Sequence, residues 1–304
     1  MVENAYFCAR IMSQWNKKEL SILIPNYNNV SVELVTCLQK QAEALGIDYE
    51  IIVADDCSTN QEVIRKNDAI NGLPHCRYIV KEQNTGSAAT RNYLSTISRY
   101  HWLLFLDCDI TIPDTDYLKR YVSDTHNGVI NGGISIIDDT RLKHNLRYLY
   151  EKAAESAHTP DKRQQQPYKE FRSTNFIIER EVFKKCPFDE RFKLSGYEDV
   201  LFGKQLKEHS ISITHIDNPV MMTDFEANPD YVSKIERSTR TLYTFRQDLK
   251  GYSRLLDITS RLPHFPIRLW QKLFGRLERR NLTGSHPRLW IFKIYKLGYF
   301  LSLP

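Results

Sequence analysis

The chain has 304 residues, which is long enough for one large domain, or one domain with an appendage, around a sizeable core. Its 26% charged and 41% hydrophobic residues are ordinary for a soluble globular protein. The net charge is +5; residues 261–304 hold nine Lys and Arg and one Glu, which gives them +8 and leaves 5 − 8 = −3 for the rest of the chain, and this argues against nucleic-acid binding.

The cysteines are scattered and form no CxxC pair, which predicts free thiols in a reducing compartment. The N-terminal stretch lacks the apolar segment of a signal peptide, and no run approaches the ~20 apolar residues that span a bilayer. We therefore expect a cytoplasmic protein.

The first part of the chain alternates between short apolar runs and segments with helical periodicity. Strands are expected at 20–25, 49–55, 77–81 and 101–107, and helices at 32–45 and 87–98. This alternation predicts an α/β fold with a Rossmann-like, mostly parallel sheet and helices on both of its faces.

Beyond residue 128 the pattern becomes less regular. We expect a strand with a glycine break at 128–137, a helix at 139–157, a polar, mobile loop at 158–171, a strand at 174–180, a helix at 197–209 and a strand at 210–216. Apolar residues from Tyr231 to Tyr252 recur at helical spacing and predict a long amphipathic helix that leaves the domain. The patterns divide the chain into a main domain at 1–228 and a basic, aromatic, helical extension at 229–304.

Each of the four early strands runs into a polar cluster, at 25–29, 55–60, 84–87 and 107–109. The carboxyl ends of parallel strands share one edge of a sheet, so these clusters converge where such sheets bind ligands. Asp107 and Asp109 stand two residues apart and point the same way, which suits a hard divalent cation. The alternative for this pair is a solvated acidic loop.

Five segments carry a resemblance to a known family: SILIPNYNN, IIVADDCSTN, NTGSAATRNYL, WLLFLDCDI and FDERFKLSGYEDVLFGKQL. Their order and spacing over residues 19–220 resemble family-2 glycosyltransferases of the bacterial polysaccharide type, which have the A-type (GT-A) nucleotide-sugar-binding fold. The resemblance implies that residues 1–228 form a GT-A catalytic domain.

The same resemblance implies a binding site for a nucleotide-sugar, formed by Pro25, Asn26, Tyr27, Asp55, Asp56, Asn84, Gly86, Arg91, Asp107 and Cys108. Asp56, with Asp55 beside it, would accept the imide N–H of uracil, and Arg91 would lie near the uracil and diphosphate. Asp109 would bind Mn²⁺ or Mg²⁺ directly, and Asp107 the ribose or the ion through water. The alternatives are an Asx turn at Asp56 and a surface position for Arg91.

The resemblance further implies that Asp199 is the general base toward the acceptor hydroxyl, while Glu198 orients the acceptor or the loop. The alternative role of both acids is to cap the following helix. We expect an inverting, metal-dependent glycosyltransferase that moves a sugar from a UDP-sugar to a hydroxyl of a saccharide or lipid-linked acceptor, in cell-surface polysaccharide synthesis. The rival interpretations are a sugar-phosphate nucleotidyltransferase, whose glycine-rich N-terminal loop is missing here, and a non-catalytic nucleotide-sugar-binding protein.

Many members of this family complete the metal site with a histidine after the strand that follows the base. Met221 and Met222 stand there instead, and a thioether is a poor ligand for Mg²⁺ or Mn²⁺. His215 and Asp224 are the alternatives nearby. We expect the ion to be held by Asp109, the diphosphate and water, with Asp107 assisting.

Residues 261–304 interleave Arg and Lys with Trp, Phe and Leu. Such segments lie in the headgroup region of anionic membranes, which would place the protein peripherally on the inner membrane face. The alternative is a pair of helices packed on the catalytic domain with a solvated basic face.

Overall fold

The structure, a computed structural model, describes residues 17–193 and 196–304. Cys8 and most of the stretch from which the lack of a signal peptide is predicted lie outside the described residues, as do Leu194 and Ser195 near the predicted base. Among the described helices, none combines the length and the apolar content needed to cross a bilayer.

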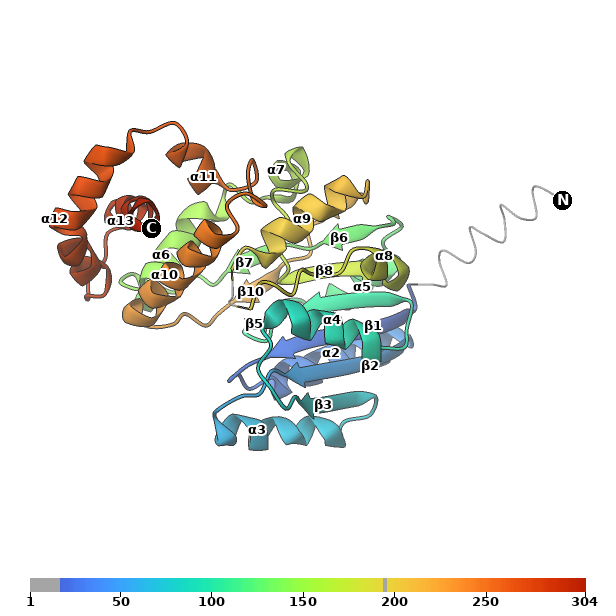
Figure 1. The fold of residues 1–304 in the computed structure, drawn as a ribbon. Helices are drawn as coiled ribbons and strands as arrows, with labels where there is room; N and C mark the ends of the chain where they lie inside the picture. The colour runs from blue at the N-terminus through green and yellow to red at the C-terminus, as the bar shows by residue number, and fades with distance from the viewer. Residues whose placement is uncertain (1–16, 194–195) are drawn as a thin grey trace.

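A seven-stranded sheet forms the centre of the described fold (Figure 1). The strands lie in the order β3-β2-β1-β4-β8-β6-β9; β8 is antiparallel to both of its neighbours, and all other neighbours are parallel. The bounds are β1 (Glu19–Asn26), β2 (Asp48–Asp55), β3 (Cys76–Val80), β4 (Trp102–Leu106), β6 (Val129–Asn131), β8 (Asn175–Glu179) and β9 (Ile213–His215). The predicted mostly parallel sheet is confirmed.

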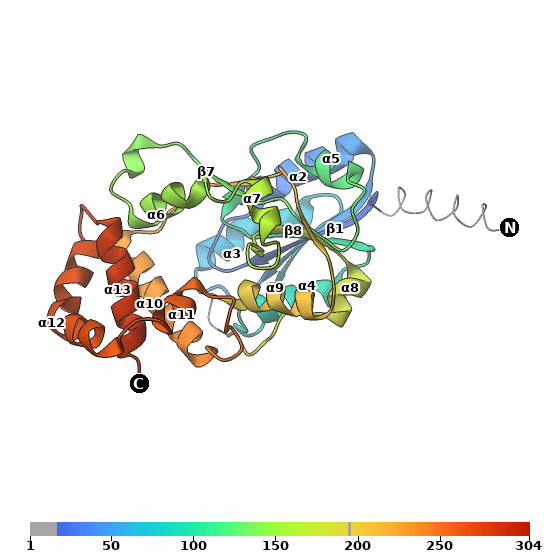
Figure 2. The same cartoon turned by 90° about the horizontal axis from the view of Figure 1, so that it is seen from above.

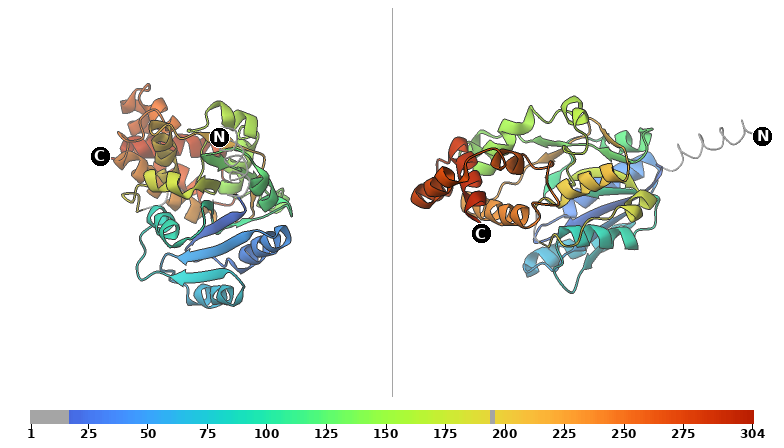
Figure 3. Two further views of the ribbon diagram at one scale, coloured as in Figure 1. Left: turned by 90° about the vertical axis from the view of Figure 1, so that its right-hand side faces the viewer. Right: turned by 45° about the horizontal axis from the view of Figure 1, so that its top comes forward.

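Helices cover both faces of this sheet, because its parallel strands are apolar on both sides (Figure 3, left). Along β1, Ile22 and Ile24 belong to one core cluster and Leu23 to the other, as the alternation of side chains in a strand requires. The first face carries α2 (Val32–Leu45), α3 (Gln61–Asn67) with the 3₁₀ turn Asp68–Gly72, and α5 (Tyr117–Ser123); the second carries α4 (Ser87–Ile97), α8 (Arg180–Lys185) and α9 (Glu198–Glu208).

A second, three-stranded sheet joins segments that are far apart in the sequence. It consists of β5 (Ile110–Thr111), β10 (Val220–Met222) and β7 (Ile134–Ile136), with β10 in the middle. Met222 pairs with Ile110, so the residues that follow β10 come beside Asp109. The strand expected at 128–137 is in fact two strands, β6 and β7, in different sheets, because Gly133 turns the chain with a φ of 86°.

The helix expected at 139–157 is shorter than the periodicity indicates. A 3₁₀ turn (Thr140–Leu142) comes first, and α6 (Leu146–Glu155) begins after Asn145. The Asn145 side chain accepts a hydrogen bond from Tyr148 N at 2.9 Å, and this cap sets the start of the helix.

The polar segment at 158–171 is not a loop throughout. The segment contains α7 (Pro160–Gln165), and its Arg163 is buried. Arg163 donates to the backbone carbonyls of Gly132 and Ile216, at 3.3 and 2.9 Å. A buried guanidinium needs such acceptors, so the arginine fastens this segment to the ends of the strands.

The predicted extension consists of α10 (Asn228–Thr244), α11 (Arg254–Thr259), α12 (His264–Leu282) and α13 (Leu289–Ser302), gathered at one end of the molecule (Figures 1 and 3). Two hydrophobic clusters join it to the rest of the chain. Tyr231 and Phe292 pack with Leu146 in one cluster, and Leu242 packs with Phe192 in the other. The extension is therefore packed onto the sheet domain, and its division from that domain at residue 228 stays a prediction.

The long helix expected from Tyr231 to Tyr252 ends at Thr244. Phe245 instead stacks on the ring of Phe192, with the two centroids 4.0 Å apart. Leu249 is fully buried in the same cluster, so its apolar character reflects packing in a turn and not a further turn of helix.

Candidate active site

The polar clusters lie where the strand order reverses. From β1 the chain passes to β2 on one side and returns, after β3, to β4 on the other side of β1. The connecting helices α2 and α4 lie on opposite faces, so the sheet opens between β1 and β4, and ligands bind at such switch points. Asn26 pairs with Asp55 at the ends of β1 and β2, and Asp107 follows β4 directly.

A cavity of about 530 Å³, here called the donor cavity, opens at this edge of the sheet. Its volume lies in the range of small-molecule sites. Most of the predicted site residues line it: Pro25, Asn26, Tyr27, Asp56, Arg91, Asp107, Cys108, Asp109, Glu198 and Asp199. Asp55, Asn84 and Gly86 are not among its lining residues.

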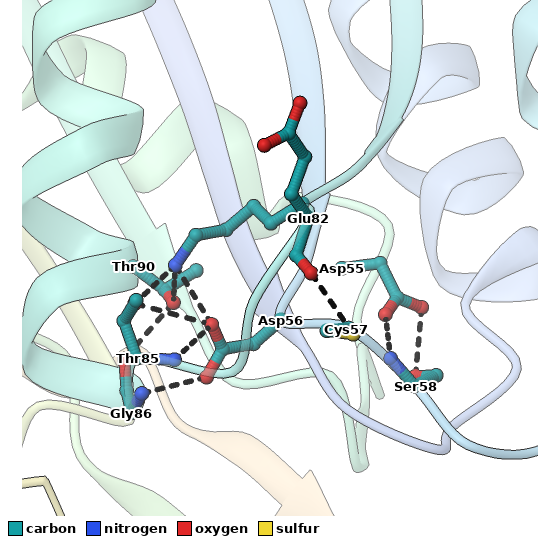
Figure 4. A network of polar contacts seen from close by, with 9 residues as sticks. Asp55, Asp56, Cys57, Ser58, Glu82, Thr85, Gly86 and Thr90 are labelled. Atoms are coloured by element: carbon teal, nitrogen blue, oxygen red, sulfur yellow. Dashed lines mark hydrogen bonds and ion pairs between the residues drawn. The ribbon is translucent and has the colours of Figure 1, made fainter.

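Asp56 is held by the loop that follows β3 (Figure 4). Its Oδ1 accepts hydrogen bonds from Lys81 Nζ at 2.7 Å and Thr85 N at 2.9 Å, and its Oδ2 accepts one from Gly86 N at 2.7 Å. Burial raises the pKa of Asp56, but the hydrogen bonds and the Lys81 charge outweigh it and hold the pKa below its ordinary value. Asp56 is therefore an ionised acceptor, and its Oδ2 has a lone pair left for a ligand.

Asp55 supports the site and does not line it. Its carboxylate accepts hydrogen bonds from Asn26 Nδ2 at 3.0 Å, Tyr78 OH at 2.6 Å, and both N and Oγ of Ser58 at 2.6 and 2.8 Å. All four donors belong to the protein, and the carboxylate is fully buried and outside the donor cavity, so a nucleotide cannot reach it. The expectation that Asp55 contacts the ligand is corrected: Asp55 positions Asn26 and the turn at Ser58.

The predicted residues of the 84–87 cluster, Asn84 and Gly86, do not line the donor cavity either. Asn84 is exposed and outside the donor cavity, whereas Gly86 is buried and offers its N–H to Asp56. Gly86 has a φ of 89°, and a Cβ there would lie 2.7 Å from the carbonyl oxygen of Lys193. Only glycine fits this position while its N–H reaches Asp56.

Arg91 lies in the wall of the donor cavity and links two other predicted residues. Its Nη2 is 2.6 Å from Asp107 Oδ1, and its Nη1 is 3.7 Å from Glu198 Oε1. Arg91 is buried, and neither its Nε nor its Nη1 has a hydrogen-bond partner among the described residues. Buried donors of this kind are costly without an acceptor, which indicates that a ligand supplies one. Arg91 is not the surface arginine of the alternative interpretation.

Asp107 and Asp109 differ in their surroundings. Asp107 is bound by Arg91 and by Thr174 Oγ1, which donates to Oδ2 at 2.7 Å. Asp109 has Arg147 as its nearest cation, with Nη2 3.7 Å from Oδ2. Burial, followed by the charge of Asp107, raises the pKa of Asp109, and the positive charges of Arg147 and Lys234 offset this only in part. Burial likewise raises the pKa of the Cys108 thiol between them to about 12, so this thiol stays protonated.

The residues after β10 face the paired carboxylates, as predicted, yet no group of three metal-ligating side chains forms among the described residues. Asp224 lines the donor cavity. His215 does not: it is buried on β9, where its Nδ1 meets Arg163 Nη1 at 2.8 Å and its Nε2 meets the Pro167 carbonyl at 2.9 Å. The alternative of His215 as a metal ligand is therefore excluded.

Glu198 and Asp199 begin helix α9 beside the donor cavity. Glu198 accepts hydrogen bonds from Ser87 Oγ at 2.9 Å and Gly196 N at 2.7 Å, so it fastens the loop before the helix. Burial, followed by the charge of Glu198, raises the pKa of Asp199 to about 7. A carboxylate with such a pKa suits proton transfer near neutral pH, which a simple helix cap does not require.

Asp199 also lines a second cavity, of about 780 Å³, here called the acceptor cavity. The two cavities share Arg147, Gly196, Asp199 and Lys234 as lining residues, so Asp199 stands on their common wall. Tyrosine side chains line the acceptor cavity, at positions 150, 197, 231 and 252, together with six Lys and Arg side chains, at 147, 169, 172, 234, 254 and 296. Arg254 and Lys296 come from α11 and α13, so the extension helps to build it.

Several residues of the site escape sequence reasoning. Lys81 is the last residue of the strand predicted at 77–81, and its position at a strand end was the one available signal. Arg147 and Lys234 come from α6 and α10, and Glu226 binds both, with Lys234 Nζ at 3.0 Å. These three lie far from the motifs in sequence, and only packing brings them to Asp109.

The mostly parallel sheet, the cavity at its switch point and the carboxylates around it define a nucleotide-binding α/β enzyme. The family model for "Glycosyl transferase family 2" matches residues 21–186, more than half of the chain, so the chain belongs to glycosyltransferase family 2.

Similarity to other protein sequences supports this family assignment. The chain is 34% identical over 90 residues to an uncharacterised glycosyltransferase of Haemophilus influenzae, covering 30% of this chain and 29% of that protein. It is 32% identical over 107 residues to a chondroitin synthase of Escherichia coli, covering 34% and 15%. A chondroitin synthase of Pasteurella multocida matches over 225 residues at 24% identity, covering 62% and 23%. The chain thus spans less than a third of each of these relatives.

Solved structures resemble the chain over nearly its whole length. S. aureus TarS 1–349 in complex with UDP-GlcNAc aligns with a TM-score of 0.50 and 17% identity, covering 93% of this chain and 90% of that one. The mannosyltransferase PcManGT of Pyrobaculum calidifontis, in complex with GDP-Man and Mn²⁺, aligns with a TM-score of 0.50 and 13% identity, covering 98% and 93%. These neighbours confirm the predicted GT-A fold.

Proposed function

We propose that this family-2 glycosyltransferase is inverting and metal-dependent, and that it moves a sugar from a UDP-sugar to a hydroxyl of a saccharide or lipid-linked acceptor. One observation carries the proposal: Asp199, with its raised pKa, stands on the wall shared by the donor and acceptor cavities. A base in this position can reach a hydroxyl that enters from one cavity and attacks a sugar held in the other.

The donor cavity suits a uridine diphosphate. Asp56 stays ionised and keeps a lone pair on Oδ2, as a partner for the imide N–H of uracil requires. The Nε and Nη1 of Arg91, which have no hydrogen-bond partner among the described residues, are donors for anionic oxygens of the diphosphate or for the polar edge of the base. TarS, a protein of similar fold, is bound to UDP-GlcNAc, which supports the assignment to UDP.

The charges of the donor cavity favour a divalent cation. Among its described lining residues are seven carboxylates and three cationic side chains, so a diphosphate entering alone would meet a net negative wall. Asp109, Asp107 and Asp224 offer the hard oxygen ligands that Mn²⁺ and Mg²⁺ prefer, and the only cation within 4.0 Å of Asp109 among the described residues is Arg147, at 3.7 Å. The bound cation would supply Lewis-acid stabilisation of the leaving diphosphate. PcManGT, which is bound to Mn²⁺, supports this choice of metal.

Different residues of the chain would have different roles in the transfer. Asp199 would take the proton of the acceptor hydroxyl as its oxygen bonds to the anomeric carbon, on the face opposite the breaking bond to UDP. Arg147 and Lys234, held by Glu226, lie on the wall near Asp109 and would offset the charge that develops on the diphosphate. Glu198 keeps the Asp199 loop in place through Gly196. A single attack of this kind inverts the anomeric carbon.

The acceptor cavity favours an acceptor that carries negative charge. The described lining residues of this cavity include six Lys and Arg side chains and four carboxylates, so its wall is cationic overall. Lys169, Arg254 and Lys296 have no carboxylate within 4.0 Å among the described residues; Lys296 is half-buried and the other two are exposed. Cations without counter-ions attract carboxylate, sulfate or phosphate groups. The tyrosines between them offer flat apolar faces of the kind that small-molecule sites use.

The experiment that tests the proposal incubates the full chain with a panel of nucleotide-sugars, Mn²⁺ and saccharide or lipid-linked acceptors, and identifies the released nucleotide and the anomeric configuration of the product. We expect UDP release that depends on acceptor and is lost on chelation. Release of pyrophosphate would identify a nucleotidyltransferase instead. UDP binding without turnover across the panel would favour a non-catalytic binding protein.

A further inference from the structure

We infer that helix α12 docks this protein on the surface of an anionic membrane, with its apolar face in the headgroup region and a basic cavity beside it holding lipid phosphates. The inference does not depend on the proposed sugar transfer. It narrows the broad expectation for residues 261–304 to one helix and assigns a site to the lipid headgroups.

The first observation is an apolar face that no other part of the described chain covers. Phe265, Leu269, Leu273 and Leu277 recur every four residues along α12, so they share one side of the helix. Phe265 is 78% exposed, and Leu273 and Leu277 are each 62% exposed. Globular proteins seldom leave such a continuous apolar strip in water. The strip therefore indicates a surface that becomes covered.

Two aromatic side chains widen this strip. Trp270 and Phe274 are exposed, and their ring centroids lie 4.4 Å apart. Trp270 Nε1 donates to Glu278 at 2.7 Å, which satisfies its polar edge while the ring stays outside the fold. Tryptophan is typical of the interface between lipid headgroups and acyl chains.

The two basic-aromatic segments of the tail have different roles. Phe292, Tyr295 and Phe300 of α13 are buried in the clusters that join the extension to the catalytic part. α12 packs on α13 through its other side, where Gly275 and Leu282 are buried. Figures 1 and 2 show α12 on the outside of the molecule, beyond α13 and far from the sheet. Both helices are therefore packed, but α13 buries its large apolar side chains whereas α12 leaves an apolar strip exposed.

The second observation is a basic cavity next to the strip. A cavity of about 700 Å³ lies between α12 and α13, and its cationic lining residues are Arg268, Lys272, Arg276 and Arg279. No Asp or Glu is among its lining residues. Arg268 donates to the Leu301 carbonyl and Arg279 to Glu236, whereas Lys272 and Arg276 have no hydrogen bond or ion pair among the described residues. Lys272 and Arg276 are therefore available to bind phosphate groups.

The charge of α12 favours a bilayer, and not a second copy of the chain, as the partner that covers the apolar strip. α12 carries one acid, Glu278, which is buried, so two copies meeting face to face would bring like charges together. An anionic bilayer offers apolar depth for the strip and phosphates for the cations at the same time. Both features of α12 are then satisfied by one partner.

The test is cosedimentation of the full chain with vesicles. We expect the wild-type protein to sediment with vesicles of equal phosphatidylcholine and phosphatidylglycerol, to sediment less as salt is added, and to stay in solution with phosphatidylcholine alone. Sedimentation velocity without vesicles should give a monomer. Absence of sedimentation with the anionic vesicles would overturn the inference.

Two variants test the basic cavity and the apolar strip of α12 separately. Lys272→Gln with Arg276→Gln should weaken partition to anionic vesicles about thirtyfold, since each cation near the surface contributes about one kcal/mol. Leu269→Gln with Leu273→Gln and Leu277→Gln should abolish it. The matched control, Lys40→Gln with Lys207→Gln, removes two exposed charges on α2 and α9 and should partition like wild type.

The changed side chains are exposed, so circular dichroism and UDP affinity should match wild type in all three proteins. If the control loses as much partition as the α12 variants, net charge and not α12 drives binding, and the inference is wrong. A dimer that the leucine changes dissociate would instead show that a second copy covers the strip.

Discussion

The guanidinium of Arg91 lies 2.6 Å from the carboxylate of Asp107, so helix α4 is joined to the residue that follows β4 at the mouth of the sheet. The contact uses Nη2, while Nη1 lies 3.7 Å from Glu198 Oε1, and neither Nη1 nor Nε has a hydrogen-bond partner among the described residues. The buried Arg91 guanidinium therefore keeps N–H groups that can donate hydrogen bonds to an anionic ligand.

Replacement of Arg91 by lysine should keep one charge but lose the planar fork of donors. We expect Arg91→Lys to weaken UDP binding by about tenfold or more, because at least one charge-assisted hydrogen bond is lost. Isothermal calorimetry with Mn²⁺ present measures this. Arg99→Lys, an exposed change after the same helix, is the control and should leave the affinity unchanged. Equal UDP affinities for both variants would show that Arg91 does not contribute to UDP binding.

Asp199→Asn should separate binding from catalysis. Transfer should fall about a hundredfold or more, because the amide cannot accept the proton, while UDP affinity should stay within about twofold. The rate of the wild-type enzyme should rise with pH and level off above about 7, as Asp199 ionises against the charge of Glu198 and with the help of Arg172 and Arg91. A variant with near-normal transfer would place the base elsewhere.

The same change should affect stability with a definite sign. Asp199 has a higher pKa in the folded state than the ordinary value of about 3.9, so the folded chain binds this proton more tightly than the unfolded chain. Its contribution to stability is full below about pH 4 and is lost as the pH rises through about 7. Asp199→Asn should therefore melt at a higher temperature than wild type at about pH 8 and at a similar temperature near pH 4. Scanning calorimetry at both values checks the sign.

Metal binding should depend on the nucleotide. No group of three ligating side chains exists among the described residues, so the free protein should bind Mn²⁺ weakly and the UDP complex about tenfold more tightly or better. Asp109→Asn should abolish the gain. Titration calorimetry with and without UDP gives both affinities. Tight binding to the free protein that Asp224→Ala removes would show that Asp224 is a third ligand.

Gly86→Ala should distort the loop that holds Asp56. The new Cβ would meet the Lys193 carbonyl at 2.7 Å in a backbone conformation that alanine disfavours, so the free energy of unfolding should fall by about 2 kcal/mol. UDP affinity should fall with it, because the Gly86 N–H bond to Asp56 is disturbed. Gly72→Ala, where nothing lies within 4 Å, should stay within about 0.5 kcal/mol of wild type. Urea unfolding of the two variants gives the comparison.

Lys296→Met should raise KM for an acceptor that bears carboxylate, sulfate or phosphate by about fivefold, with UDP affinity unchanged. Lys293→Met lies one turn away on α13, is exposed, and should leave KM unchanged. The assay uses a water-soluble acceptor without vesicles, so that membrane contact plays no part. An equal KM for the charged acceptor in both variants would argue against an anionic acceptor.

Local patterns predicted much of the framework and part of the site. The apolar runs of β1, β2 and β4 and the periodicity of α2 appear at their expected places, within a residue or two. The polar ends of β2 and β4 identified Asp56 and Asp109, because parallel strands carry their carboxyl ends to one edge whatever their order in the sheet, whereas Arg91 was identified through the family resemblance. These features depend on neighbours within a few positions, and such neighbours are visible in the sequence.

Tertiary structure alone decided which of two similar residues acts. Asp55 and Asp56 cannot be told apart in the sequence. In the structure, successive side chains of the strand point to opposite sides, so Asp55 bonds to protein groups in the interior and Asp56 faces the cavity. The two basic-aromatic segments of the tail look alike, yet α13 is buried and α12 is exposed. Lys81, Arg147 and Lys234 join the site from separate elements. The physical reason is the same in each case: burial and pairing depend on contacts between distant segments, which no local periodicity encodes.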